Sequence, residues 1–173
     1  MKTKGITGYK RLLLAVCMIA ILFIIVSLPG TARAASGTWT TVGSAGFSTG
    51  VAANPSMALD SSGAPYVAYI DSSNSLKATV MKYNSVTSQW ETVGSAFSAA
   101  KSSYTSIVLD SSGTPYVAYQ DGGNSNKATV MKYNSVTSKW ETVGTAGFSA
   151  GRASYPSIAL DSSGTPYVAY MDG

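Results

Sequence analysis

From residue 35 onward, short apolar runs alternate with polar turns rich in Asp, Ser, Gly and Asn. The runs are rich in Val, Ile, Thr and Tyr and are too short for helices, which is typical of β-strands. Asp, Ser and Gly favour tight turns, because the side chains bond nearby backbone groups and Gly tolerates positive φ. One stretch predicts a four-stranded antiparallel meander, with strands at residues 104–109, 115–120, 127–133 and 139–144.

The pattern recurs every 50 or 51 residues. The sequence DSSGAPYVAY begins at Asp60, and DSSGTPYVAY begins at Asp110 and Asp161. The sequence KATVMKYNSVTS occurs unchanged at 77–88 and 127–138. Four strands repeated at this period are typical of a β-propeller blade. We therefore predict an all-β fold, a β-propeller of four-stranded antiparallel blades.

The second strand of each unit is apolar on both faces, because Tyr116 and Ala118 point one way and Val117 and Tyr119 the other. We expect these residues to pack between neighbouring blades. The motif WxTVG recurs on the outermost strand, and we expect its tryptophans to wedge between blades near the rim. They are Trp39, Trp90 and Trp140.

The predicted propeller occupies residues 35–173. It comprises a closing strand at 38–43, blades at 56–94 and 104–144, and a half blade at 156–173. These are about two and a half blades, fewer than the roughly four that a ring requires. The predicted ring is therefore incomplete in this chain, and we expect the remainder of the same chain to close it. Assembly of one ring from several chains is the alternative.

Residues 1–34 have the layout of a secretory signal peptide. A basic start precedes an apolar run at 12–28, and Ala32-Arg33-Ala34 provides a small-residue cleavage site. The run is also near the lower limit for a spanning helix, so an uncleaved anchor is the alternative. We expect a secreted or cell-wall-associated protein without any other membrane contact.

The charge of the chain changes once this segment is set aside. It contains five of the 12 basic residues and none of the 8 acidic ones, which leaves a net charge of −1. No basic patch therefore argues for a nucleic-acid partner. The only cysteine, Cys17, also lies in this segment, so no disulfide framework is expected.

The run PSIALDSSGTPYVAY at 156–170 resembles the core of the NHL-type repeat of secreted bacterial propellers. The added WETVG strand and the period of about 50 residues are closer in length to kelch-like units. The kelch double glycine is absent, and the sialidase Asp-box is only approximated. The resemblance implies a propeller but no particular chemistry, because such propellers serve as binding platforms, adhesins, lectins and enzymes.

Catalytic chemistry has few candidate residues. The chain has no histidine, and its cysteine is confined to the predicted signal segment. We expect Asp60, Asp110 and Asp161 to bond backbone amides in their turns. Glu91 and Glu141 are expected to be solvated charges on the outer strand. We predict no catalytic residue, cofactor or metal ion; calcium is disfavoured because Asp-x-x-Asn supplies too few oxygen ligands.

The blade-to-blade loops differ most between copies, and the loops between strands two and three should open on the same face. A ligand could be recognised there. The candidate ligand-binding residues are Asp71, Asn74, Lys101, Asp121, Asn124 and Arg152. Simple solvated turns are the alternative interpretation.

We predict a non-catalytic module for binding or display, with a glycan or a protein as partner. One alternative is the N-terminal part of a secreted enzyme acting on polysaccharide, with its catalytic residues outside this sequence. A structural spacer is another.

Overall fold

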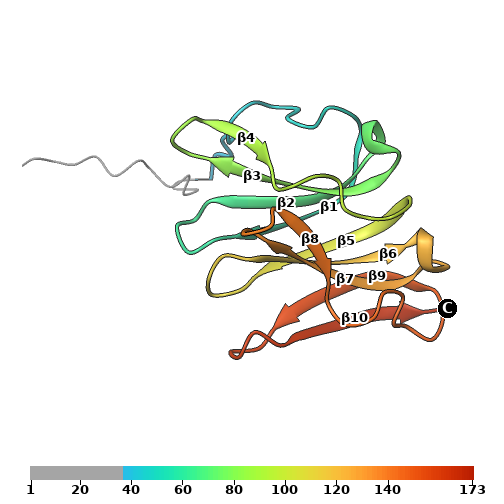
Figure 1. The fold of residues 1–173 in the computed structure, drawn as a ribbon. Coiled ribbons are helices and arrows are strands. Elements are labelled where there is room, and N and C mark those ends of the chain that lie inside the picture. The colour runs from blue at the N-terminus through green and yellow to red at the C-terminus, as the bar shows by residue number, and fades with distance from the viewer. Residues whose placement is uncertain (1–36) are drawn as a thin grey trace, which may run out of the picture. The chain divides into compact units, whose positions relative to one another are not determined.

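The computed structural model describes residues 37–173, which form ten strands and two short 3-10 helices. Figure 1 shows the strands as successive antiparallel sheets. Sheet A contains β1 (Ala52–Leu59), β2 (Pro65–Asp71), β3 (Lys77–Asn84) and β4 (Gln89–Thr92). Sheet B contains β5 (Ser102–Leu109), β6 (Pro115–Asp121), β7 (Lys127–Asn134) and β8 (Lys139–Thr142). Sheet C contains β9 (Ala153–Leu160) and β10 (Pro166–Asp172). The all-β, four-stranded antiparallel prediction is confirmed.

The turn between the first two strands of each sheet is built by its aspartate, as predicted. Oδ1 of Asp60 accepts hydrogen bonds from the backbone N–H groups of Ser62 and Ala64, both at 2.9 Å. Gly63 has φ 83°, which a side chain would strain. The same bonds recur at Asp110 and Asp161. These three carboxylates are therefore occupied by their own turns.

Sheets A and B share an apolar interface. Val80 and Ala68 of sheet A meet Val117, Ile107 and Tyr119 of sheet B, all buried. A second interface joins the other face of sheet B, with Ala118 and Val130, to Ile158 of sheet C. The two faces of β6 thus serve two different interfaces, as predicted for inter-sheet packing.

Polar contacts also join the first strands of neighbouring sheets. The hydroxyl of Ser56 in β1 accepts the backbone N–H of Ile107 in β5 at 3.1 Å. Ser106 in β5 accepts that of Ile158 in β9 at 3.2 Å. Two successive pairs of sheets are therefore joined by an equivalent hydrogen bond from a backbone amide to a serine hydroxyl.

Each full sheet carries a tryptophan that fits into the segment preceding that sheet. The Trp140 indole N–H donates to the carbonyl of Val93 at 2.9 Å, and its ring stacks on Phe97 at 4.2 Å. Gly94 lies against the same ring, where a Cβ would stand 3.2 Å from the indole nitrogen. Trp90 makes the equivalent contacts with Val42, Gly43 and Phe47. We call this arrangement the tryptophan joint; it places Trp140 between sheets A and B, as predicted, and Trp90 against the segment that precedes sheet A.

The wedge predicted for Trp39 finds no partner sheet among residues 37–173, so it stays a prediction. Residues 38–43 form no strand, and the Trp39 side chain is 95% exposed. A strand needs a hydrogen-bonded neighbour, and the part of the chain described here offers this segment none. That residues 38–43 complete a last blade stays a prediction.

The signal peptide predicted at 1–34 lies outside the described residues. Among residues 37–173, no helix has the length and apolar character needed to span a membrane.

Candidate functional site: the linker edge

The predicted site residues lie along one edge of the sheets. Each linker ends beside the turn that follows the second strand of the next sheet. The backbone carbonyl of Lys101 accepts a hydrogen bond from the N–H of Gly122 at 3.1 Å. The backbone carbonyl of Arg152 likewise accepts one from the N–H of Gly173 at 3.0 Å. We call this the linker edge; it comprises residues 42–51, 93–101 and 143–152 with the turns at 71–76 and 121–126. The prediction that these loops share one edge is confirmed.

Asp71 and Asp121 are buried, with 1% and 2% of their surface exposed. Each caps a three-residue 3-10 helix, and Asp71 accepts the backbone N–H of Ser73 at 2.9 Å. Burial alone would raise the pKa of Asp71, but hydrogen bonds from the Ser73 hydroxyl and amide and from Asn74 lower it. Asp121 also accepts the hydroxyl of Thr129 at 2.9 Å. Both carboxylates therefore build the turns.

Asn74 and Asn124 are committed to the same turns. The side-chain amide of each donates to the preceding aspartate at 2.8 Å. Of the six predicted site residues, Lys101 and Arg152 alone are both exposed and free of side-chain hydrogen bonds among the described residues.

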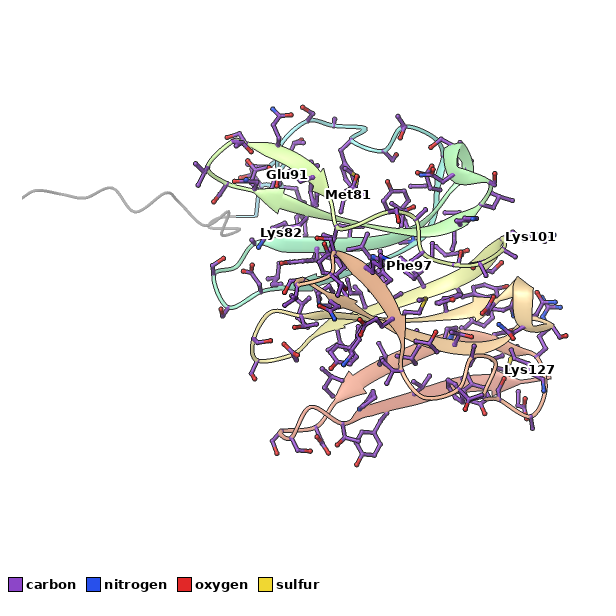
Figure 2. All side chains as sticks on the ribbon, in the orientation of Figure 1. Met81, Lys82, Glu91, Phe97, Lys101 and Lys127 are labelled. Carbon is purple, nitrogen blue, oxygen red and sulfur yellow. The ribbon has the colours of Figure 1, made fainter. Side chains whose placement is uncertain are left out.

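Charge is distributed unevenly between the two edges. Lys77 and Lys127 begin β3 and β7, so they join Lys101 and Arg152 at the linker edge. Figure 2 shows Lys101 and Lys127 on one side of the molecule and Lys82 with Glu91 on the other. Four cations thus share the linker edge with three aspartates, two of them buried, whereas the opposite edge carries three lysines and five acids. The linker edge is therefore the more attractive one for an anion.

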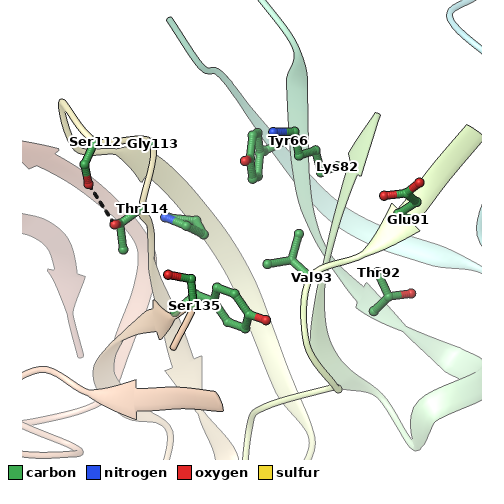
Figure 3. Close-up of a pocket in the computed structure, with 11 residues that line it drawn as sticks. Tyr66, Lys82, Glu91, Thr92, Val93, Ser112, Gly113, Thr114 and Ser135 are labelled. Atoms are coloured by element: carbon green, nitrogen blue, oxygen red, sulfur yellow. Dashed lines mark hydrogen bonds between the residues drawn. The ribbon is translucent and has the colours of Figure 1, made fainter. Parts of the chain in front are cut away.

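A groove of about 330 Å³ lies at the opposite edge, between sheets A and B. Figure 3 shows Tyr66 and Lys82 on one side of it and the turn of Ser112 and Thr114 on the other. Nζ of Lys82 lies 3.2 Å from Asp60 Oδ2 and 4.9 Å from the centre of the Tyr66 ring. The lysine is thus already satisfied by two partners.

Glu91 also lines the groove, and it holds the adjacent β3–β4 turn together. Its Oε1 accepts the side-chain amide of Asn84 at 2.8 Å, and Glu141 does the same with Asn134 at 2.7 Å. Glu91 is exposed and Glu141 half-buried, both on the outermost strand. The prediction of purely solvated charges missed these two bonds. The described residues contain no cluster of three or more metal-ligating side chains.

Sequence reasoning also missed two tyrosines beside the linker edge. Tyr104 and Tyr155 lie near the starts of β5 and β9, and their ring centres are 4.3 Å apart. The corresponding residue of β1 is Asn54. This difference between otherwise similar copies was the available signal.

Comparison with protein-family models gives no match, and comparison with curated proteins gives none either.

Proposed function

We propose that the protein is a non-catalytic, exported binding or display module built on a β-propeller, and that the linker edge carries its ligand. The observation that carries the proposal is the contrast between near-identical sheets and a variable edge where exposed cations gather. A rigid repeated scaffold with variable loops is the usual arrangement of a binding surface.

The tryptophan joint supports the propeller. Linker 143–152 repeats the parts of the joint at Val143, Gly144 and Phe148. No tryptophan fills it among the described residues; Phe148 is 42% exposed, and a Cβ on Gly144 would meet nothing within 4 Å. A further sheet of the same kind would complete this joint.

The outward faces of sheets A and C support the same architecture. Met57 of sheet A is 63% exposed, whereas its counterpart in sheet B, Ile107, is buried. Tyr167 of sheet C is 61% exposed, whereas its counterpart Tyr116 packs in the interface between sheets B and C. Apolar side chains equivalent to interior ones favour further stacked repeats over solvent contact.

A binding role is supported by the exposed, unpaired cationic side chains of the linker edge among residues 37–173. Asp71 and Asp121 are committed to their turns and Asp172 accepts the N–H of Gly151, whereas Lys101 and Arg152 are exposed and make no ion pair with any residue from 37 to 173. Cations held on a rigid edge are suited to recognising an anionic group on a glycan or protein surface.

A glycan array and a pull-down of surface proteins, both with the full-length protein, test the proposal. We expect a retained ligand, and we expect Lys101→Ala with Arg152→Ala to reduce its capture at least about tenfold. Lys139→Ala, an exposed lysine at the opposite edge, is the matched control and should have no effect. Undiminished capture by the double variant would remove the linker edge from the proposal, and cleavage of an array glycan would contradict the non-catalytic role.

A further inference from the structure

Tyr104 and Tyr155 occupy an unusual backbone conformation. Both have φ 52°, in the left-handed region, and lie where the pairing register of β5 and β9 shifts. Such φ values are tolerated by Asn but are costly for a bulky side chain. Asn54 has φ 50° at the same position of β1. The bulge therefore forms with asparagine, and the later copies carry tyrosine there despite the strain.

The Tyr155 ring is exposed to solvent and the Tyr104 ring is half-buried. The Tyr155 side chain is 65% exposed, and its ring is tilted by 47° against that of Tyr104. Neither ring belongs to the apolar interfaces between sheets. The pair is thus an aromatic surface on the first strands of two neighbouring sheets.

Each of these tyrosines is accompanied by a cation three residues earlier in the chain. Lys101 precedes Tyr104, and Arg152 precedes Tyr155, whereas the copy with Asn54 has Val51. Cation and ring are therefore present together or absent together. Contact with Tyr104 raises the pKa of Tyr155, and the positive charge of Arg152 opposes this rise.

We propose that Tyr104 and Tyr155, with Lys101 and Arg152, form a platform for an acidic saccharide. The C–H face of a pyranose ring carries partial positive charge and lies favourably on the negative face of a tyrosine ring. A carboxylate on the sugar then pairs with the guanidinium or ammonium group beside it. This inference rests on the proposed binding function and specifies its ligand class.

The chain itself supplies the variants that test this platform. Tyr155→Asn restores the residue that the first copy tolerates in the same conformation, so the bulge is kept and the ring is lost. Lys101→Val likewise restores the residue of the first copy. Val136→Ala removes an exposed apolar side chain from the β7–β8 turn, and Lys139→Ala removes a lysine from the opposite edge.

The experiment is titration calorimetry of the full-length protein with hexameric oligogalacturonate, its methyl ester and inorganic polyphosphate. We expect the oligogalacturonate to bind, and Tyr155→Asn and Lys101→Val each to weaken binding about tenfold without lowering the melting temperature. The two control variants should stay within about twofold. The methyl ester should bind at least about tenfold more weakly than the free acid.

Four outcomes overturn the platform. If the methyl ester binds as tightly as the free acid, the cations have no role in binding the saccharide. If polyphosphate binds and Tyr155→Asn does not weaken its binding, the site recognises charge alone and the tyrosines have no role. Absence of oligogalacturonate binding by a protein that retains another ligand on the array would refute this inference and leave the proposed function standing. Absence of every ligand would refute both.

Discussion

Residues 77–88 and 127–138 have the same sequence and the same strands, yet their side chains find different partners. The Thr129 hydroxyl donates to Asp121 and accepts the N–H of Gly147, each at 2.9 Å. The Thr79 hydroxyl is buried and has no partner among the described residues. Identical local sequence therefore guarantees the strand but not the hydrogen bonds of its side chains.

The linkers explain this difference. Linker 93–101 has nine residues and linker 143–152 has ten, and the additional residue corresponds to Gly147. Gly147 has φ 63° and brings its N–H to Thr129. The shorter linker supplies no equivalent N–H to Thr79. One residue in a surface segment thus accounts for one of the two hydrogen bonds that Thr129 makes and Thr79 lacks.

The largest expected effect comes from breaking the joint that holds the shorter linker. Trp140→Ala removes the stack on Phe97 and the bond to Val93, and should cost about 3 kcal/mol of unfolding free energy. Val136→Ala, at an exposed apolar residue of the β7–β8 turn, is the control and should change stability by less than about 0.5 kcal/mol. Urea unfolding of both variants is the measurement, and equal effects would contradict the joint.

The two threonines should respond in opposite directions to the same substitution. Thr129→Val removes one of the hydrogen bonds to the buried Asp121 carboxylate and leaves the Gly147 N–H without a partner, at a cost of about 2 kcal/mol. Thr79→Val removes a hydroxyl that has no partner, and should be neutral or stabilising by up to about 1 kcal/mol. Melting curves of the Thr129→Val and Thr79→Val variants measure these two effects. A similar loss in both would show that Thr79 is bonded after all, for instance to water.

Lengthening the shorter linker should remove the difference. A glycine inserted between Ala96 and Phe97 restores the pattern of linker 143–152 and should stabilise the protein by about 1 kcal/mol. The longer loop costs little entropy. Thr79→Val in this background should then become destabilising, so a double-mutant cycle by chemical denaturation tests the coupling directly. Additive effects would count against the explanation.

The smallest effect concerns the lysines of the same repeated stretch. Burial alone would raise the pKa of Asp60, but bonds from Ser62, the Ala64 amide and Lys82 lower it to about 2. A carboxyl whose folded-state pKa is depressed stabilises the fold above its unfolded pKa, near 4. That stability is lost as pH falls toward 2. Lys82→Met should therefore cost up to about 0.5 kcal/mol at neutral pH and nothing below pH 2.

Lys132 provides the control for this ion pair, because it makes none with any residue from 37 to 173. Lys132→Met should leave the pH dependence of the melting temperature unchanged between pH 2 and 7. Identical pH profiles for the two variants would mean that the bond between Lys82 and Asp60 contributes nothing in solution.

Most of the fold follows from local sequence, because each strand is a short β-branched run bounded by a self-contained turn. The strand predicted at 104–109 begins two residues earlier, at Ser102, because its start pairs with Asp121 across the sheet. The role of Gly94 could not be predicted, because the ring it contacts comes from Trp140 in the next sheet.

The candidate site was less predictable. Asp71 and Asp121 accept hydrogen bonds within their own turns, as Asp60 does. These bonds could therefore have been predicted from the sequence. The exposure of Tyr155 could not be predicted from the sequence. Alternation along a strand predicts the face on which a side chain lies only where the pairing register is regular. The register shift in β9 removes that assumption.

The tryptophan joint has a consequence for how such a protein grows. Every unit of 50 or 51 residues carries both halves of the joint: the indole on its last strand and the phenylalanine and glycine in the segment that follows. A tandem duplication of one unit in the gene therefore produces a copy that fits its neighbours on both sides without any compensating mutation. The number of repeats is free to change by recombination while the contact between them stays the same.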